Sequence, residues 1–277
     1  MEAPEGAPAF VLAVPGTPGE TVRGLAEEVV SIARSELPGL DGRIGYVDGD
    51  EEEYPALSAV LDQALDERTA RYEQAKAAGA EVSEPKGPVA VVVPLLAGPH
   101  PDLLAQVRKA VEASRAEAEL TDVLGPHPLL AEALHVRLSE AGLARADRAR
   151  LFTVATAADG IILVSTGGPD AVQAAGITGM LLAARLAVPV MAASLDDEGA
   201  VATTAKELRE SGSSQLALAP HLIGPEVDSA LLEAAAQDAG CSAAEPLGAY
   251  PAIGKLALSQ YATLLGIKLP QQGTPLR

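Results

Sequence analysis

Histidine is the side chain of this sequence best suited to metal or acid–base chemistry, because a neutral imidazole can bind a metal ion or accept a proton. The chain has four histidines and one cysteine, Cys241. His100 stands in the segment Gly98-Pro99-His100 after an apolar run, which makes it our candidate catalytic residue and a weak candidate metal ligand. One histidine alone is a poor metal site, because stable sites use three or four protein ligands. The alternative is a loop histidine at the start of a helix.

The other three histidines are weaker candidates. His221 follows Pro220 at the end of an apolar run, where it either lines a ligand site or has a structural role. His127 lies in "LGPHP", but the matching position later in the chain is Tyr250, which favours a structural position with a polar tip. His135 falls within a helical pattern and is expected to be structural.

Turns of small residues follow several apolar runs. Residues 10–20, "FVLAVPGTPGE", show an apolar run that stops at Pro-Gly-Thr-Pro-Gly before a helical pattern, with no side chain for acid–base chemistry. Glycine permits close backbone approach, and N–H groups at a helix N-terminus can bind anions. Ligands of parallel α/β sheets bind at the carboxyl ends of strands. The candidate ligand-binding residues at such positions are Pro15, Gly16, Thr17, Gly98, Gly167, Gly168, His221 and Gly224.

The two halves of the chain share one plan. "VLAVPGTPG" (11–19) resembles "ILVSTGGPD" (162–170), "VPLLAGP" (93–99) resembles "APHLIGP" (219–225), and "LGPHPL" (124–129) resembles "LGAYPA" (247–252). Three matches in the same order predict a duplicated domain. The matched segments are further apart in the first half, where residues 62–86 read as a solvated helical insertion.

These repeats alternate apolar runs with helical patterns, which predicts a doubly wound parallel sheet in each half. Strands are expected at 10–14, 43–47, 89–95, 161–164, 189–193 and 215–219. The first helix should bury Val22, Leu25, Val29 and Ile32. We therefore predict two similar α/β domains facing across a cleft, 1–145 with the insertion 62–86 and 146–277, with the linker near 138–151.

Composition excludes several classes of function. With 20 Lys and Arg against 38 Asp and Glu, the net charge is −18, and no basic stripe for nucleic acid is visible. An anionic membrane would repel the chain, and it has no apolar run long enough for a span. A single cysteine and an acidic N-terminus without a signal-peptide pattern favour the cytoplasm.

The duplicated α/β half, the small-residue turn after the first strand and "VLGPHPLLAEALHVRLSEAG" (123–142) resemble the sirohydrochlorin cobalto-/ferrochelatases. These class II chelatases insert a divalent metal into a tetrapyrrole in cobalamin or siroheme synthesis. The resemblance spans residues 8–266 apart from the insertion. It implies a metal-binding histidine where this chain has Pro15, a second at His100, and Gly-Ser-Arg-Asp where this chain has Gly-Gly-Pro-Asp at 167–170.

The resemblance leaves two hypotheses for function. The favoured one is a degenerate chelatase-like protein that binds a tetrapyrrole-like small molecule or a protein partner without inserting metal, because proline has no side-chain donor or acceptor. The alternative is an active lyase that uses His100 with Co²⁺ or Fe²⁺. The acidic run 48–54, Lys255 and Arg185 are either site residues or ordinary surface charges. Nucleotide binding is less favoured, because neither a G-x-G-x-x-G nor a Walker motif is present.

Overall fold

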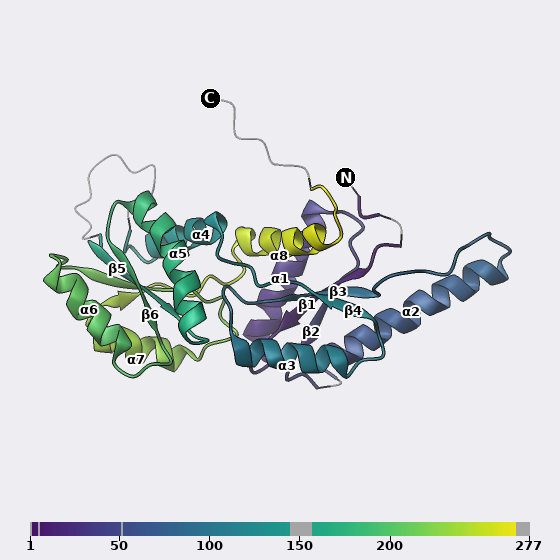
Figure 1. Cartoon of the computed structure of the whole chain (residues 1–277), viewed down its shortest axis with the longest axis horizontal. Coiled ribbons are helices and arrows are strands. Elements are labelled where there is room, and N and C mark those ends of the chain that lie inside the picture. Colours follow the sequence, from purple (N-terminus) through teal and green to yellow (C-terminus); the bar gives the residue numbers. More distant parts are fainter. Residues whose placement is uncertain (1, 5, 51, 145–156, 270–277) are drawn as a thin grey trace, which may run out of the picture. The chain divides into compact units, whose positions relative to one another are not determined.

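The protein is an α/β protein with two four-stranded parallel sheets, as seen in a computed structural model that describes residues 2–4, 6–50, 52–144 and 157–269 (Figure 1). The strand orders are β2-β1-β3-β4 and β6-β5-β7-β8, so both sheets have the same topology. The predicted fold class is confirmed in its two parallel α/β sheets. Among the described residues, no helix is both long enough and apolar enough to cross a membrane.

The first sheet contains the strands β1 (Ala9–Val14), β2 (Gly42–Tyr46), β3 (Ala90–Pro94) and β4 (Ala118–Leu120). Its helices are α1 (Glu20–Glu36), α2 (Leu57–Ala77), α3 (Pro101–Glu112) and α8 (Pro251–Leu264). Every residue of β1 and β3 is buried, as expected for parallel strands covered on both faces. Val11 and Val92 pack in a cluster with residues of α2 and α3, whereas Phe10 meets the ring of Tyr261 from α8 edge-on.

The second sheet contains the strands β5 (Gly160–Ser165), β6 (Val190–Ser194), β7 (Leu216–Pro220) and β8 (Ser242–Ala243). Its helices are α4 (Pro128–Glu140), α5 (Pro169–Leu186), α6 (Ala200–Glu210) and α7 (Ser229–Ala239). Ile162 and Val164 belong to a core with α6 and α7, while Leu163 packs toward Gly179 of α5. Alternate side chains of β5 therefore face different helices.

Helix α1 shows how the sequence pattern and the packing differ. Its buried residues are Ala26, Val29, Val30 and Ala33, so only Val29 of the four predicted positions is fully buried. Ile32 lies instead toward α8, where a Cβ added at Gly254 would come within 2.6 Å of the Ile32 Cβ.

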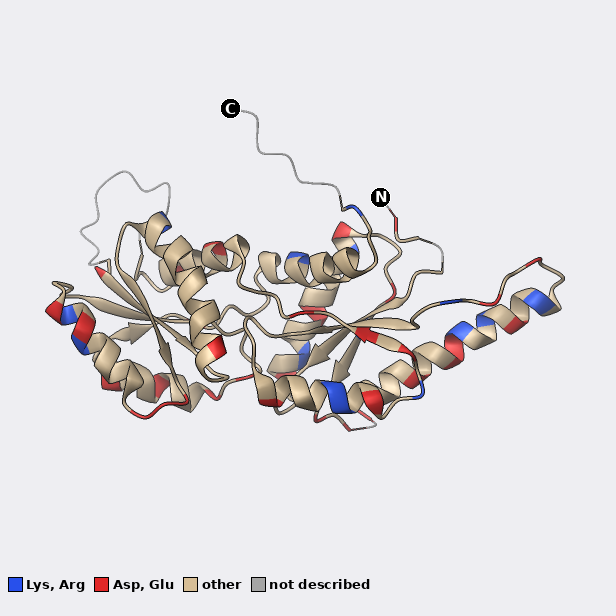
Figure 2. Ribbon diagram, viewed as in Figure 1, with Lys and Arg blue, Asp and Glu red and all other residues tan. Residues whose placement is uncertain are grey.

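Helix α2 is apolar only at its beginning. Leu57, Val60, Leu61 and Ala64 are buried, and beyond them the helix extends away from the strands of its sheet (Figure 1). Acidic and basic residues both occur along this extension (Figure 2). The predicted insertion 62–86 is helical to residue 77, and the following stretch to residue 88 returns to β3 without regular structure.

Contacts between Cα atoms divide the chain into two compact units. Unit 1 contains residues 1–94, 106–122 and 254–277, and unit 2 contains residues 95–105 and 123–253. Segments thus alternate between the units along the chain, and α4 belongs to unit 2 and most of α8 to unit 1. The predicted domains, 1–145 and 146–277, remain a prediction, as does the cleft between them. The second half of the predicted linker, residues 145–151, lies outside the described residues.

Candidate ligand site at the strand ends

The structure places the predicted site residues in two groups. Pro15, Gly16 and Thr17 lie in unit 1, in the loop at 15–19 after β1, which we call the first turn. The others lie in unit 2, around the loop at 165–168 after β5, which we call the second turn, and at the ends of β3 and β7: Gly98, His100, Gly167, Gly168, His221 and Gly224. Each group is at the carboxyl ends of parallel strands, where ligands of such sheets bind.

The first turn has few side-chain groups that could bind a ligand or take part in a reaction. Pro15 is buried and Thr17 is exposed, and Gly16 has a positive φ of 82°. Gly19 caps α1 without any side-chain hydrogen bond. The turn therefore offers a ligand its backbone N–H groups and one exposed hydroxyl, with no acid or base.

The second turn is already occupied by a carboxylate of the chain itself. The Asp196 Oδ2 atom accepts hydrogen bonds from the N–H groups of Gly167 (2.7 Å) and Gly168 (3.1 Å), at the N-terminus of α5. The expectation that these N–H groups are free to meet an anion is therefore wrong. Asp196 follows β6, and sequence reasoning missed it, because an acidic residue after a strand resembles any other loop acid.

The end of β7 shows the same arrangement. The carboxylate of Glu226 accepts hydrogen bonds from the N–H groups of Ile223 (2.5 Å) and Gly224 (2.8 Å). Burial raises the pKa of Glu226, and the backbone hydrogen bonds oppose that rise. Gly224 is therefore engaged by a side chain only two residues further along.

His100 stands immediately before α3. Its Nδ1 atom accepts a hydrogen bond from the N–H of Leu103 at 3.4 Å, which is how a residue caps a helix N-terminus. The Pro99–His100 backbone lies against Gly167, where an added Cβ would be 2.6 Å from the Pro99 carbonyl oxygen and 2.9 Å from the His100 Cα. The structure thus brings His100 and the second turn together. Its predicted catalytic role stays a prediction.

His221 is buried, with 1% of its surface exposed. Its Nε2 atom lies 3.2 Å from the Thr178 Oγ1 atom on α5. Burial lowers the pKa of His221 to about 4, so the imidazole is neutral at pH 7. A Cβ added at Gly98 would be 3.6 Å from the His221 Cε1, so the loop after β3 passes close over the ring.

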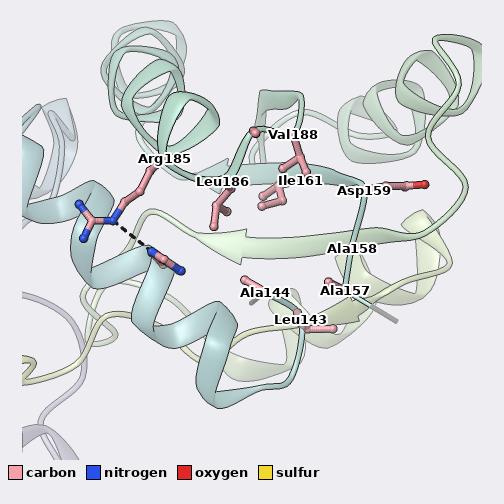
Figure 3. A pocket seen from close by; sticks show the side chains of 11 residues that line it. Leu143, Ala144, Ala157, Ala158, Asp159, Ile161, Arg185, Leu186 and Val188 are labelled. Carbon is pink, nitrogen blue, oxygen red and sulfur yellow. Dashed lines mark hydrogen bonds between the residues drawn. The ribbon is translucent and has the colours of Figure 1, made fainter. Parts of the chain in front are cut away.

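The remaining two histidines bind groups of the protein itself. The Nδ1 atom of His127 accepts from the N–H of Leu129 at 3.1 Å and caps α4, and burial lowers its pKa. The Nδ1 atom of His135 accepts from the Arg185 Nε at 3.0 Å (Figure 3). Among the described residues, no group of three or more His, Cys, Asp or Glu is arranged to hold a metal ion.

The larger hollows of both units lie elsewhere. In unit 2, a hollow of about 480 Å³ lies beside the beginning of β5 and the end of α5, lined by His135, Asp159 and Arg185 among others (Figure 3). In unit 1, a hollow of about 580 Å³ lies between the extension of α2 and the N-terminal segment. The strand ends of unit 2 instead hold a cavity of about 10 Å³. These two larger hollows therefore lie away from the polar side chains at the strand ends.

The other predicted charges have partners. Arg185 binds His135, and the Lys255 Nζ atom lies 3.5 Å from Glu36. In the acidic run 48–54, the Asp50 Oδ1 atom accepts three backbone N–H bonds, from Glu52, Glu53 and Tyr54. These bonds lower the pKa of Asp50 and order an exposed loop.

Comparison with known proteins shows the fold. No protein-family model and no curated protein matches the sequence. The chain is similar to the solved structure of SirB from Bacillus subtilis with Fe³⁺, with a TM-score of 0.57 and 13% identity over 95% of this chain and 100% of that chain. A periplasmic ribose ABC transporter from Conexibacter woesei matches at 14% identity over 76% of this chain and 63% of that chain. Its TM-score of 0.30 is too low to indicate a shared fold. The protein therefore has a chelatase-like fold of two parallel α/β sheets.

Proposed function

We propose that this is a chelatase-like protein that binds a tetrapyrrole-type small molecule without inserting a metal ion. The proposal is carried by one observation: His100, His127 and His135 each use their Nδ1 atom to accept a hydrogen bond from a group of the protein. The chelatase-like fold supports the kind of ligand.

The tautomer of these three rings decides whether a ring nitrogen can bind a metal ion. A neutral imidazole has one N–H and one nitrogen with a free lone pair. Because the Nδ1 lone pair of each ring accepts a hydrogen bond, the proton is on Nε2, and that nitrogen has no lone pair for a metal. A ligating histidine usually donates its other N–H to an acceptor, which is the reverse arrangement. Metal binding at His100 Nε2 would require the ring to give up its cap on α3.

Pro15 supports the same conclusion. The resemblance to class II chelatases places a metal-binding histidine at this position, and proline has neither a donor nor a lone pair in its side chain. The first turn retains the backbone N–H groups of the α1 N-terminus, which suit an anionic group of a ligand.

Incubation with sirohydrochlorin and Co²⁺ or Fe²⁺ tests the proposal. We expect sirohydrochlorin alone to raise the melting temperature, and the absorption spectrum to show no metal insertion above the protein-free rate. His100→Ala and the matched cap variant His127→Ala should each cost about 1 kcal/mol of stability. Metal insertion that is lost in His100→Ala and retained in His127→Ala would establish an active chelatase instead. If sirohydrochlorin leaves the melting temperature unchanged, the ligand class is wrong.

A further inference from the structure

Three buried polar atoms line the small cavity at the strand ends of unit 2. Ser165 Oγ, Thr166 Oγ1 and His221 Nδ1 have no hydrogen-bond partner among the described residues, and their residues are 2%, 8% and 1% exposed. Ser165 ends β5, Thr166 follows it, and His221 follows β7. All three residues line the cavity of about 10 Å³.

Such atoms are costly when left without a partner. Buried polar groups in folded proteins are nearly always hydrogen-bonded, either to the protein or to an ordered water. Three orphaned atoms around one cavity therefore indicate an occupant rather than three separate defects. Among the other lining residues, Leu96, Ala97 and Ala171 are apolar and offer no side-chain partner. His100 and Glu226 also line the cavity, and both already accept hydrogen bonds from backbone N–H groups.

We propose that this cavity is a binding site for one water molecule, which bridges Ser165, Thr166 and His221. A cavity of this volume has room for about one water molecule, so a larger ligand is excluded. A buried water typically makes about three hydrogen bonds, which is the number of orphaned atoms. Hydroxyl groups and a neutral imidazole can each donate or accept, which suits water better than an ion.

The water would fix the ring of His221 from both sides. Thr178 holds the Nε2 atom, and the bridging water would hold the Nδ1 atom and tie it to the end of β5. The carboxylate of Glu226 also lines the cavity, but it already accepts from two backbone N–H groups. The inference does not depend on the proposed function, because the site needs neither a tetrapyrrole nor a metal.

The sign of a stability change tests the proposal. If the water is present, Thr166→Val and Ser165→Ala each remove one of its partners, and the melting temperature should fall by a few degrees. If the hydroxyls are truly unsatisfied, the same substitutions remove a buried orphan and should raise the melting temperature. Thr178→Val is the matched control: its hydroxyl has a protein partner, so its loss should lower the melting temperature in either case.

A high-resolution crystal structure gives the direct readout. We expect one density peak within hydrogen-bond distance of all three atoms in the wild-type protein, and a displaced or absent peak in Thr166→Val. A stabilised Thr166→Val, an empty cavity, or a peak that refines as a metal ion or a halide would each overturn the proposal.

Discussion

The first turn and the second turn occupy the same place in sheets of the same strand order, yet they differ in how the helix that follows each turn is capped. In the second turn the N–H groups of Gly167 and Gly168 are taken by Asp196, and buried hydroxyls stand beside them. In the first turn α1 begins at Gly19 without a side-chain cap. The topology fixes where a strand-end turn lies, but the neighbouring loops decide whether its backbone is available to a ligand.

The second turn is also more closely packed than the first turn. Gly167 has a φ of 109° and lies against the Pro99–His100 backbone, whereas Gly19 has an extended φ of −175° and open space at its Cβ position. Substitutions in the second turn should therefore cost far more than those in the first.

The largest expected effect is that of Gly167→Ala. The added Cβ would lie 2.6 Å from the Pro99 carbonyl oxygen, which is backbone and cannot rotate away, and φ is strained for alanine. We expect a loss of about 4 kcal/mol in the free energy of unfolding, measured by urea denaturation.

Gly168→Ala is the control for this prediction. Its φ is 81°, but nothing lies within 4 Å of the added Cβ. Only the backbone strain remains, about 1–2 kcal/mol. Equal losses in the two variants would contradict the close packing of His100 on the second turn.

The second prediction concerns the pH dependence of stability. The pKa of His221 is about 4 in the folded protein against an ordinary value of 6.5. Between these values the unfolded chain binds more protons, so stability is complete above pH 6.5 and falls as the pH decreases toward 4. The full difference is about 3 kcal/mol.

Comparison with His221→Asn isolates this contribution. Burial also lowers the pKa of His127, which acts in the same direction, and raises the pKa of Glu226, which acts in the opposite direction. Both groups are common to the two proteins. Urea denaturation at pH 4.5 and 7 should therefore show a weaker loss of stability in His221→Asn; an equal loss would mean that His221 is not buried in its neutral form.

The sequence predicted the six longer strands to within one or two residues, because buried parallel strands are runs of apolar residues. It missed β4 (Ala118–Leu120) and β8 (Ser242–Ala243), which are short and partly or fully exposed, so no apolar run marks them. The contact-based units also could not be read from a linear pattern, because they depend on where α4 and α8 pack.

The sequence indicated where the candidate site lies, but it did not indicate the hydrogen bonds that its residues make. Small residues after apolar runs predicted the turns at the strand ends, and a helix start was the alternative considered for His100. Asp196 was not identified, because a carboxylate after a strand looks like any exposed loop acid until its distance to the second turn is known. The Nδ1 bonds of His100 and His127 depend on ring orientation, which residue type and spacing do not specify.

The third prediction concerns the removal of the carboxylate that binds the second turn. Asp196→Ala removes the acceptor of the Gly167 and Gly168 N–H groups, and we expect a loss of about 1 kcal/mol, because the carboxylate is exposed. Sulfate should restore part of that stability by binding the freed N–H groups. Asp197→Ala, which changes an adjacent exposed acid, is the control and should show neither effect. Loss of stability without any response to sulfate would mean that the turn rearranges when Asp196 is removed.

The smallest effect is expected in the first turn. Thr17 is exposed, and α1 begins without a side-chain cap, so Thr17→Ala should change the free energy of unfolding by less than about 0.5 kcal/mol. Because the turn contributes little to stability, any effect of this substitution on the sirohydrochlorin-dependent rise in melting temperature reports on ligand contact. A reduced rise with unchanged stability of the free protein would place the ligand at the first turn. A loss above 1 kcal/mol in the free protein would show that both turns are structural, and the contrast between them would fail.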